Sequence, residues 1–141
     1  MKIAIINGPN LNLLGKREVD IYGDESFDNF FTYLQEKYTA IELTYYQSNI
    51  EGELIDEIQR TGFSFDGIIL NPGGYTHTSV AIGDAIAAIT APLVEVHISN
   101  IFGREEFRKL SHVSGKAKGV ISGLGLKGYE LALLYFTDMK F

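Results

Sequence analysis

A chain of 141 residues, 45% of them hydrophobic and 21% charged, is long enough for one globular domain and too short for two. No apolar run approaches the roughly 20 residues that a membrane-spanning helix needs, and a net charge of −6 disfavours nucleic acids and anionic membranes as partners. The absence of cysteine excludes a disulfide, a thiolate nucleophile and a thiolate metal site.

The apolar stretch at residues 1–7 is short and is not followed by the small-residue cleavage pattern of a signal peptide. A buried strand explains this stretch better. We therefore expect a soluble, cytoplasmic protein that forms a single domain over residues 1–141.

Short β-branched runs alternate with helical patterns along the whole chain, which is typical of repeated β-α units and a parallel sheet. Most of these runs are continuously apolar, as expected for strands that helices cover on both faces. The expected strands span residues 2–7, 41–46, 67–70, 93–97 and 119–122.

The spacing of apolar residues predicts helices between these strands. One is expected over residues 27–38 after a Ser26 cap, and another follows Ile50. A third is expected from Ser79 to about residue 89, a short one over residues 104–110, and a final one from 128 to about 139.

This alternation predicts an α/β fold, a flavodoxin-like doubly wound sheet of five parallel strands in the order 2-1-3-4-5, with helices on both faces. In such sheets ligands bind at the carboxyl ends of the strands, beside the switch point between strands one and three. We therefore expect an enzyme whose site is built from the loops that follow the strands.

The loop after the first strand, residues 8–25, is much longer than an ordinary connection between a strand and a helix. It combines turn residues with a cation, Arg17, and a phenol, Tyr22, which favours a binding loop or lid over simple packing. Three of the four arginines, Arg17, Arg104 and Arg108, lie in or beside loops. A local site for an anion and ordinary surface charge both explain them.

The loop after the third strand begins with Asn71, contains two glycines, and leads through His77 into a helix. Free backbone N–H groups at a helix N-terminus can hold a carboxylate or a phosphate. Thr78 or Ser79 can equally well do no more than cap this helix. His77 has no core to fill, which favours a functional role.

The fourth strand ends with Glu95 and His97, which point to the same face because they are two residues apart. A carboxylate beside an imidazole fixes its tautomer and raises its basicity, as a general acid or base requires. The apolar residues that precede the pair suggest that Glu95 is at least partly buried.

Taken together, these segments resemble type II 3-dehydroquinate dehydratase, the type II 3-dehydroquinase family. The similarity covers nearly the whole chain, with the motifs in the right order. They are INGPNLNLLG at 6–15, RE at 17–18, YG at 22–23, QSN at 47–49, EGELI at 51–55, NPG at 71–73, THTS at 76–79, EVHISN at 95–100, REEFR at 104–108, GLG at 123–125 and GY at 128–129.

The resemblance implies a flavodoxin-like fold, a dodecamer of four trimers, and the elimination of water from 3-dehydroquinate to 3-dehydroshikimate without metal or organic cofactor. It implies that Tyr22 takes the proton next to the ketone, with Arg17 activating it, and that His97, oriented by Glu95, protonates the departing hydroxyl. Asn10 would hold the water that stabilises the enolate. The implied substrate-binding residues are Asn71, His77, Ile98, Ser99 and Arg108, and Asp84 would reach the site of a neighbouring subunit.

Chemistry is consistent with these implied roles. A free phenol with a pKa of about 10 is almost entirely protonated at neutral pH, so a tyrosine base needs a nearby cation such as Arg17. The backbone N–H groups of Ile98 and Ser99 suit a carboxylate, because they are fixed donors. Closure of the long loop would exclude water from the enolate.

Three positions depart from the family pattern. Phe102-Gly103 stands where His-Ala is common, Gly83 where Arg often precedes Asp84, and His112-Val113 where Tyr-Leu is usual. None of them is assigned to the chemistry. These departures bear on subunit contacts and substrate affinity more than on the reaction.

Other classes of protein share the expected fold. A phosphorelay receiver needs acidic residues where this chain has Asn7 and Asn71, and a flavin-binding module needs hydroxyls in the loop after the first strand. A metal hydrolase would need histidines at the spacing of metal ligands, and the three histidines of this chain lack that spacing. A non-catalytic binding module is the remaining alternative, and the same reaction could serve aromatic amino acid biosynthesis (the shikimate pathway) or quinate breakdown.

Overall fold

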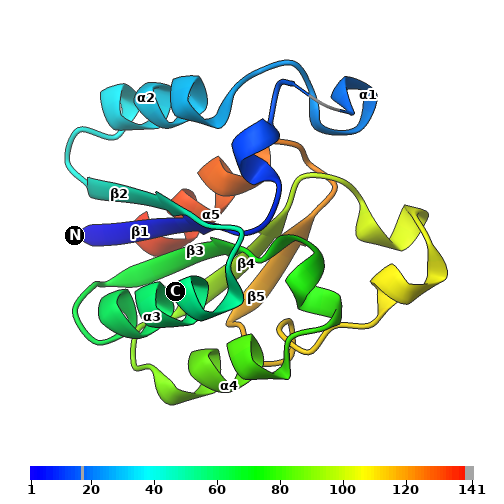
Figure 1. Cartoon of the computed structure of the whole chain (residues 1–141). Coiled ribbons are helices and arrows are strands. Elements are labelled where there is room, and N and C mark those ends of the chain that lie inside the picture. The colour runs from blue at the N-terminus through cyan, green and yellow to red at the C-terminus, as the bar shows by residue number, and fades with distance from the viewer. Residues whose placement is uncertain (17, 139–141) are drawn as a thin grey trace.

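The computed structural model describes residues 1–16 and 18–138. Five strands form one parallel sheet in the order β2-β1-β3-β4-β5 (Figure 1), which confirms the predicted strand order. The strands are β1 (Lys2–Asn7), β2 (Glu42–Gln47), β3 (Gly67–Asn71), β4 (Leu93–His97) and β5 (Gly119–Ser122). Only β2 and β3 differ from the predicted strands, each by a single residue at one or both ends.

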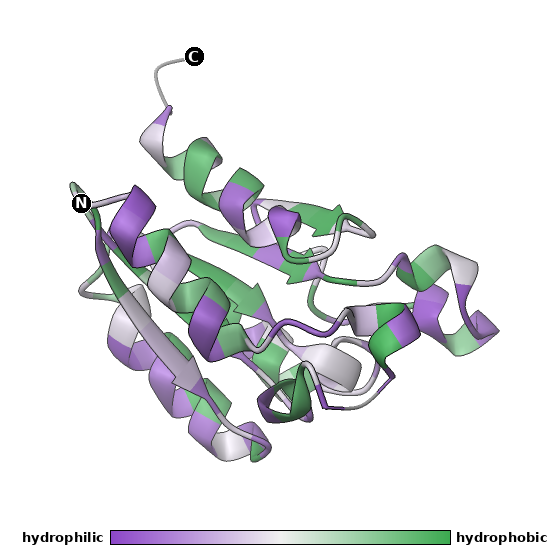
Figure 2. Cartoon of the chain, turned by 90° about the horizontal axis from the view of Figure 1, so that it is seen from above, coloured by the Kyte–Doolittle hydropathy of each residue, from purple (hydrophilic) through white to green (hydrophobic). Residues whose placement is uncertain are grey.

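Helices cover both faces of the sheet, as predicted. Helices α2 (Phe27–Lys37) and α5 (Lys127–Thr137) pack on one face, and α3 (Glu51–Gly62) and α4 (Val80–Ala88) pack on the other. Alternate residues of β1 serve the two sides, since Ile3 and Ile5 belong to the first core and Ala4 and Ile6 to the second. Figure 2 shows mainly hydrophobic strands in the middle of the molecule, with helices of mixed character around them.

Serine caps fix where two of these helices begin. The Ser26 hydroxyl accepts a hydrogen bond from the Asn29 N–H at 3.2 Å, and the Ser79 hydroxyl accepts one from Ile82 at 2.9 Å. Each cap satisfies one of the backbone donors that a helix N-terminus leaves unpaired. Both caps were predicted from the sequence, although Ser79 was one of two candidates.

The long connection after β1 is partly ordered by its own short helices, η1 (Leu11–Leu13) and α1 (Val19–Tyr22). Leu11 and Leu14 are buried in the core beneath α2 and α5, so the first half of the connection is anchored to the domain. The second half, around α1, has mostly exposed side chains. A lid can therefore involve only this second half.

The short helix predicted over residues 104–110 is present, but as a 3₁₀ helix of four residues. The connection between β4 and β5 contains only two 3₁₀ turns, η3 (Ile101–Gly103) and η4 (Glu106–Lys109). The Arg108 N–H donates to the Glu105 carbonyl three residues back, and Leu110 returns to extended backbone. A helix this short is marginal without tertiary support, and the Leu110 carbonyl is held by His77 instead.

One departure from the family pattern has a local structural reason. Gly83 is buried in α4, and a Cβ at this position would lie 2.4 Å from the His112 carbonyl oxygen. No side chain fits there unless the 111–114 turn moves. Val113 of this turn is fully buried in the core beneath α3 and α4, so the turn is fixed against the helix.

None of the helices formed by residues 1–16 and 18–138 is long and apolar enough to cross a membrane.

Candidate active site

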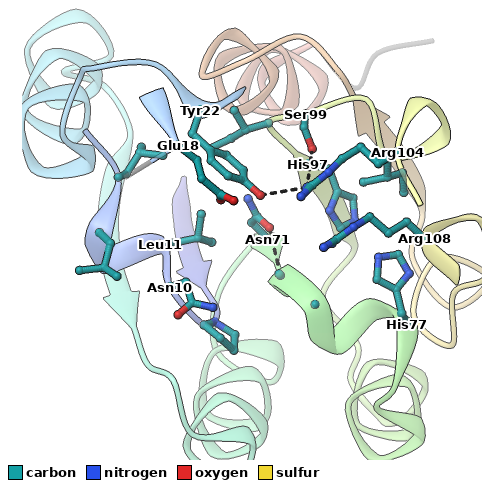
Figure 3. A pocket seen from close by; sticks show the side chains of 17 residues that line it. Asn10, Leu11, Glu18, Tyr22, Asn71, His77, His97, Ser99, Arg104 and Arg108 are labelled. Carbon is teal, nitrogen blue, oxygen red and sulfur yellow. Dashed lines mark hydrogen bonds between the residues drawn. The ribbon is translucent and has the colours of Figure 1, made fainter. Parts of the chain in front are cut away.

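A cavity of about 260 Å³ lies at the carboxyl ends of β1, β3 and β4 (Figure 3), beside the switch point of the sheet. Most of the residues predicted for the site line it, namely Asn10, Tyr22, Asn71, His77, His97, Ile98, Ser99 and Arg108. They come from connections that are far apart in the sequence. The parallel sheet brings them together because all its strands end at the same edge.

Two predicted residues that the structure describes, Glu95 and Asp84, are not in the cavity lining. Glu95 lies behind His97, fully buried. Asp84 is exposed on α4 and does not line the cavity of its own chain. Arg17 lies outside the described residues.

His97 and Glu95 form the pair that the strand spacing predicts. The His97 Nε2 lies 2.6 Å from the Glu95 Oε1, and both residues are buried. Because the carboxylate accepts the Nε2–H, the Nδ1 of His97 is left as the ring nitrogen for a ligand in the cavity. Within the described residues this Nδ1 makes no hydrogen bond.

The Tyr22 hydroxyl is held by a cation that the sequence reasoning did not assign. Arg104 donates to the Tyr22 oxygen at 2.9 Å and to the Ser99 hydroxyl at 3.1 Å, and its guanidinium lies 5.7 Å from the Tyr22 ring centre. Figure 3 shows Arg104 reaching from one wall of the cavity to Tyr22 on another. These bonds fix the position of the phenol oxygen in the cavity. The arginine-rich 104–108 segment was the available signal for this role.

His77 lines the wall of the cavity next to Arg108. Its Nδ1 lies 2.7 Å from the Leu110 carbonyl oxygen, and its ring meets the Phe107 ring edge-on at 5.7 Å. Burial lowers the pKa of His77 below its ordinary value, and the charges of His97 and Arg108 act in the same direction. A neutral His77 donates through Nδ1 to the carbonyl, which leaves Nε2 as a hydrogen-bond acceptor.

Asn71 is fixed from behind by a buried network. Its Nδ2 donates to the Tyr129 hydroxyl at 2.9 Å, and that hydroxyl donates to the Asn7 Oδ1 at 2.8 Å. Its Oδ1 accepts the Gly73 N–H at 3.1 Å. Asn7 and Asn71 face each other as register partners at the ends of β1 and β3. The network therefore locks the amide of Asn71 at the switch point.

The two loops at the switch point touch through a glycine. A Cβ at Gly8 would lie 2.6 Å from the Pro72 carbonyl oxygen, and the Gly8 N–H donates to the Asn71 carbonyl at 2.8 Å. Asn10 follows in the left-handed region at φ 69°, with its N–H donating to the Asn49 side chain at 3.0 Å. These contacts set the position of Asn10 against the cavity.

The expected anion site at the α4 N-terminus is not part of this cavity. Gly73 and Gly74 line the cavity, but they begin the 3₁₀ turn η2 (Gly73–His77), whose later residues separate them from α4, and Ser79 caps the helix. Among the described residues, the cations that line the cavity are Arg104 and Arg108. The β4–β5 connection thus supplies positive charge for an anionic ligand.

No group of three or more His, Cys, Asp or Glu side chains among the described residues is placed to hold a metal ion.

Comparison with known proteins gives one consistent result. The family model described as dehydroquinase class II matches residues 1–137. A 3-dehydroquinate dehydratase of Fusobacterium nucleatum is 53% identical over 98% of this chain and 97% of its own length. Another, of Thermotoga neapolitana, is 49% identical over 99% of this chain and 97% of its own length.

Solved structures agree. The type II dehydroquinase from Butyrivibrio crossotus has a TM-score of 0.93 and 48% identity, and the match covers 97% of each chain. A 3-dehydroquinate dehydratase-like protein from Bifidobacterium longum matches with a TM-score of 0.71 and 29% identity, over 99% of this chain and 97% of the other. On the strength of its full-length match and its parallel 2-1-3-4-5 sheet, this chain belongs to the class II dehydroquinase family.

Proposed function

We propose that the chain is a 3-dehydroquinate dehydratase, a hydro-lyase that removes water from 3-dehydroquinate to give 3-dehydroshikimate without a cofactor. The observation that carries this proposal is the pairing of two proton-transfer groups in one cavity. Tyr22, held by Arg104, and His97, held by Glu95, both line it.

Tyr22 acts as the base in this proposal. Its phenolate removes a proton from the carbon next to the ketone, and the electron pair moves to the ketone oxygen to form an enolate. The Arg104 guanidinium donates to the phenol oxygen at 2.9 Å and so holds this oxygen in the cavity for proton transfer. Arg17 is proposed to assist, as the family resemblance implies, and Asn10 to hold a water on the enolate oxygen.

His97 acts as the acid. The enolate reforms the carbonyl and expels the β-hydroxyl, which takes a proton from His97 Nδ1 and leaves as water. Glu95 accepts the Nε2–H at 2.6 Å and so fixes both the tautomer and the ring orientation. The product is a conjugated enone acid, and a proton must return from Tyr22 to His97 before the next turnover.

The remaining cavity residues bind the substrate. Arg108 supplies a positive charge, and the Ile98 and Ser99 backbone N–H groups are proposed to donate to the substrate carboxylate. Asn71 and the His77 Nε2 are proposed to hold the ring hydroxyls. The locked amide of Asn71 and the carbonyl-bound His77 suit this role, because both are oriented before substrate arrives.

We further propose a homo-oligomer, a dodecamer of four trimers, in which Asp84 completes the site of a neighbouring subunit. Asp84 is exposed and lies outside the cavity of its own chain, which is what such a role requires.

One assay tests the proposed function directly. Purified protein mixed with 3-dehydroquinate should produce the ultraviolet absorbance of a conjugated enone acid, and dialysis against a chelator should leave the rate unchanged. A flavin-binding module would produce no such absorbance and would carry a yellow cofactor. Growth of an aromatic auxotroph on complementation, set against growth on quinate, would separate the biosynthetic from the catabolic role, and cell fractionation would test the cytoplasmic location.

A further inference from the structure

Glu95 is a fully buried carboxylate whose charge is balanced mainly by hydrogen bonds. Its side chain is 0% exposed, and within the described residues its ion-pair partner is His97 alone. Two hydroxyls complete its surroundings. Thr76 Oγ1 donates to Oε1 at 2.6 Å, and Ser114 Oγ donates to Oε2 at 2.5 Å. Both of its oxygens therefore accept donors, which is the pattern of an ionised carboxylate.

A third hydroxyl organises the first two. Ser111 Oγ lies 2.6 Å from Thr76 Oγ1 and 2.9 Å from Ser114 Oγ. Each hydroxyl has one proton. Since Thr76 and Ser114 donate theirs to Glu95, the single Ser111 proton is left to donate to one of these two hydroxyls, while Ser111 Oγ accepts the Val113 and Ser114 N–H groups at 3.0 and 2.9 Å. The Thr76 and Ser114 bonds therefore both point a proton, and with it partial positive charge, toward the Glu95 carboxylate.

These hydroxyls come from two connections that the backbone ties together. Thr76 lies in η2 and is 0% exposed, and its carbonyl accepts the His112 N–H at 2.8 Å. Ser114 lies in the turn after η4 and lines a second cavity that is separate from the one containing His97. Water can therefore approach Ser114 but not Thr76.

We propose that Thr76 and Ser114 are positioning residues, whose hydroxyls hold Glu95 as a carboxylate and set how readily the Glu95–His97 pair gives up its proton. The proposal rests on the proposed function, in which His97 is the acid. Burial raises the pKa of Glu95, but His97 and then the Ser114 and Thr76 hydroxyls outweigh this effect and hold the pKa below its ordinary value. The hydroxyls thus supply part of the stabilisation that a buried carboxylate needs.

The direction of the effect follows from charge. Before proton loss the pair is neutral overall, with a protonated His97 beside the carboxylate. After proton loss it carries an uncompensated negative charge on Glu95. Hydroxyl donors stabilise this second state more than the first, so they favour release of the proton from the Glu95–His97 pair. Removing a donor should move the loss of the proton to higher pH.

A relay of protons through the hydroxyls is chemically excluded as the main role. After His97 gives up its Nδ1 proton, its Nε2 still carries the proton that faces Glu95. A proton arriving through Ser114 and Glu95 would meet a nitrogen that is already protonated. The hydroxyls therefore act through charge and geometry.

Other charged groups face the pair and stay in place in the test. His77 faces it from η2, Arg108 from η4, Arg104 from the segment between η3 and η4, and Tyr22 from α1. None of them bonds to Thr76. Replacement of Thr76 therefore leaves these groups unchanged.

The test is the pH profile of kcat for Thr76→Val, which removes a buried hydroxyl where water cannot replace it. We expect the alkaline limb to move upward by roughly half to one pH unit and the plateau to fall about tenfold. Thr76→Ser should restore both. Ser114→Ala should move the limb in the same direction by no more, because water from the second cavity can take the place of the hydroxyl. Thr61→Val, which deletes a buried hydroxyl in α3 that is bonded to the Glu57 carbonyl, is the matched control and should leave the limb in place.

A second readout needs no substrate. Titration of the His97 ring by nitrogen NMR in the free protein should show the same upward shift in Thr76→Val, and should do so even if 3-dehydroquinate proves not to be the substrate. If the parent protein fails in the absorbance assay, the proposed function is overturned but this inference is not. An alkaline limb and an NMR titration that stay in place, or that move to lower pH, in a folded Thr76→Val protein would overturn this inference.

Discussion

The Tyr22 phenol oxygen is the atom on which the proposed base chemistry depends. Tyr22→Phe deletes only this oxygen from a residue on the short helix α1, and Arg104 keeps its bond to Ser99. We expect kcat to fall by about 10²-fold or more, with an unchanged melting temperature and oligomer size. Steady-state kinetics and thermal unfolding check this together, and near-normal turnover would remove Tyr22 as the base.

His97 and Glu95 should respond differently to replacement. His97→Ala should lower kcat by about 10²–10⁴-fold and change KM little, because the proton is used only in the transition state. Glu95→Gln keeps the volume but weakens the bond that orients the ring, so its kcat should lie between that mutant and the parent. Single-turnover kinetics separates an effect on the chemical step from an effect on substrate binding. A larger loss at Glu95 than at His97 would reverse the roles, and equal losses of affinity alone would redirect the search to His77.

Sequence alone placed the site well where the residue types were unusual for their position. A histidine and a glutamate on one face of a buried strand, and a histidine in a glycine loop, have no packing explanation, and the structure puts both histidines in one cavity. Arg104 was missed because its partner lies 82 residues away in the chain, in the connection after β1. No local pattern reports such a contact. The catalytic roles themselves stay predictions.

At the level of elements, α2 and α5 are clamped by one buried carboxylate. Glu130 in α5 accepts hydrogen bonds from Lys37 at 2.6 Å, Tyr38 at 2.6 Å and Lys127 at 2.7 Å. Burial raises the pKa of Glu130, yet these three donors outweigh it and lower the pKa to about 2. The clamp joins the C-terminal end of α2 to the first turn of α5.

This clamp predicts a pH dependence of stability. A carboxyl whose pKa is lower in the folded than in the unfolded state stabilises the fold above its unfolded value, about 4.3, and that contribution is lost as pH falls toward 2. We expect Glu130→Gln to lower the free energy of unfolding by about 1–2 kcal/mol at pH 7 and to flatten its decline between about pH 5 and pH 2. Urea unfolding across this range measures both. Glu36→Gln, an exposed change in α2, should leave the parent curve unaltered, and parallel curves for Glu130→Gln and parent would contradict the clamp.

The elements that sequence reasoning found are those with a strong apolar pattern. The buried strands, the amphipathic α2 and the start of α3 were predicted to within a residue or two, because burial on one or both faces dictates their residues. Helix α1 and the turns η1 to η4 were not recognised in that form. Their geometry comes from contacts such as that of His77 with Leu110, which join distant segments. Such contacts do not produce a periodic pattern of apolar residues in the sequence.

For the whole molecule, the exposure of Asp84 gives the proposed assembly a test. Asp84→Asn and His97→Ala should each be nearly inactive alone, since each would lack one part of every site. Mixed by co-expression, they should regain part of the parent activity, because an Asp84→Asn subunit keeps its own His97 and can receive Asp84 from an His97→Ala neighbour. Light scattering should show a dodecamer. A fully active monomer would rule out a shared site. So would mixed oligomers of the two variants that form but recover no activity.

The segment between β4 and β5 contributes far more than its share of the cavity. Residues 98–118 carry Ser99, Arg104 and Arg108, the carbonyl that orients His77, and the hydroxyls of Ser111 and Ser114 behind Glu95. An insertion or deletion there would disturb three things at once: the positive charge that faces the ligand, the orientation of His77 and the surroundings of Glu95. The site should thus be inherited as a block, and changes of length should be tolerated better at the amino ends of the strands, such as the connection between α2 and β2.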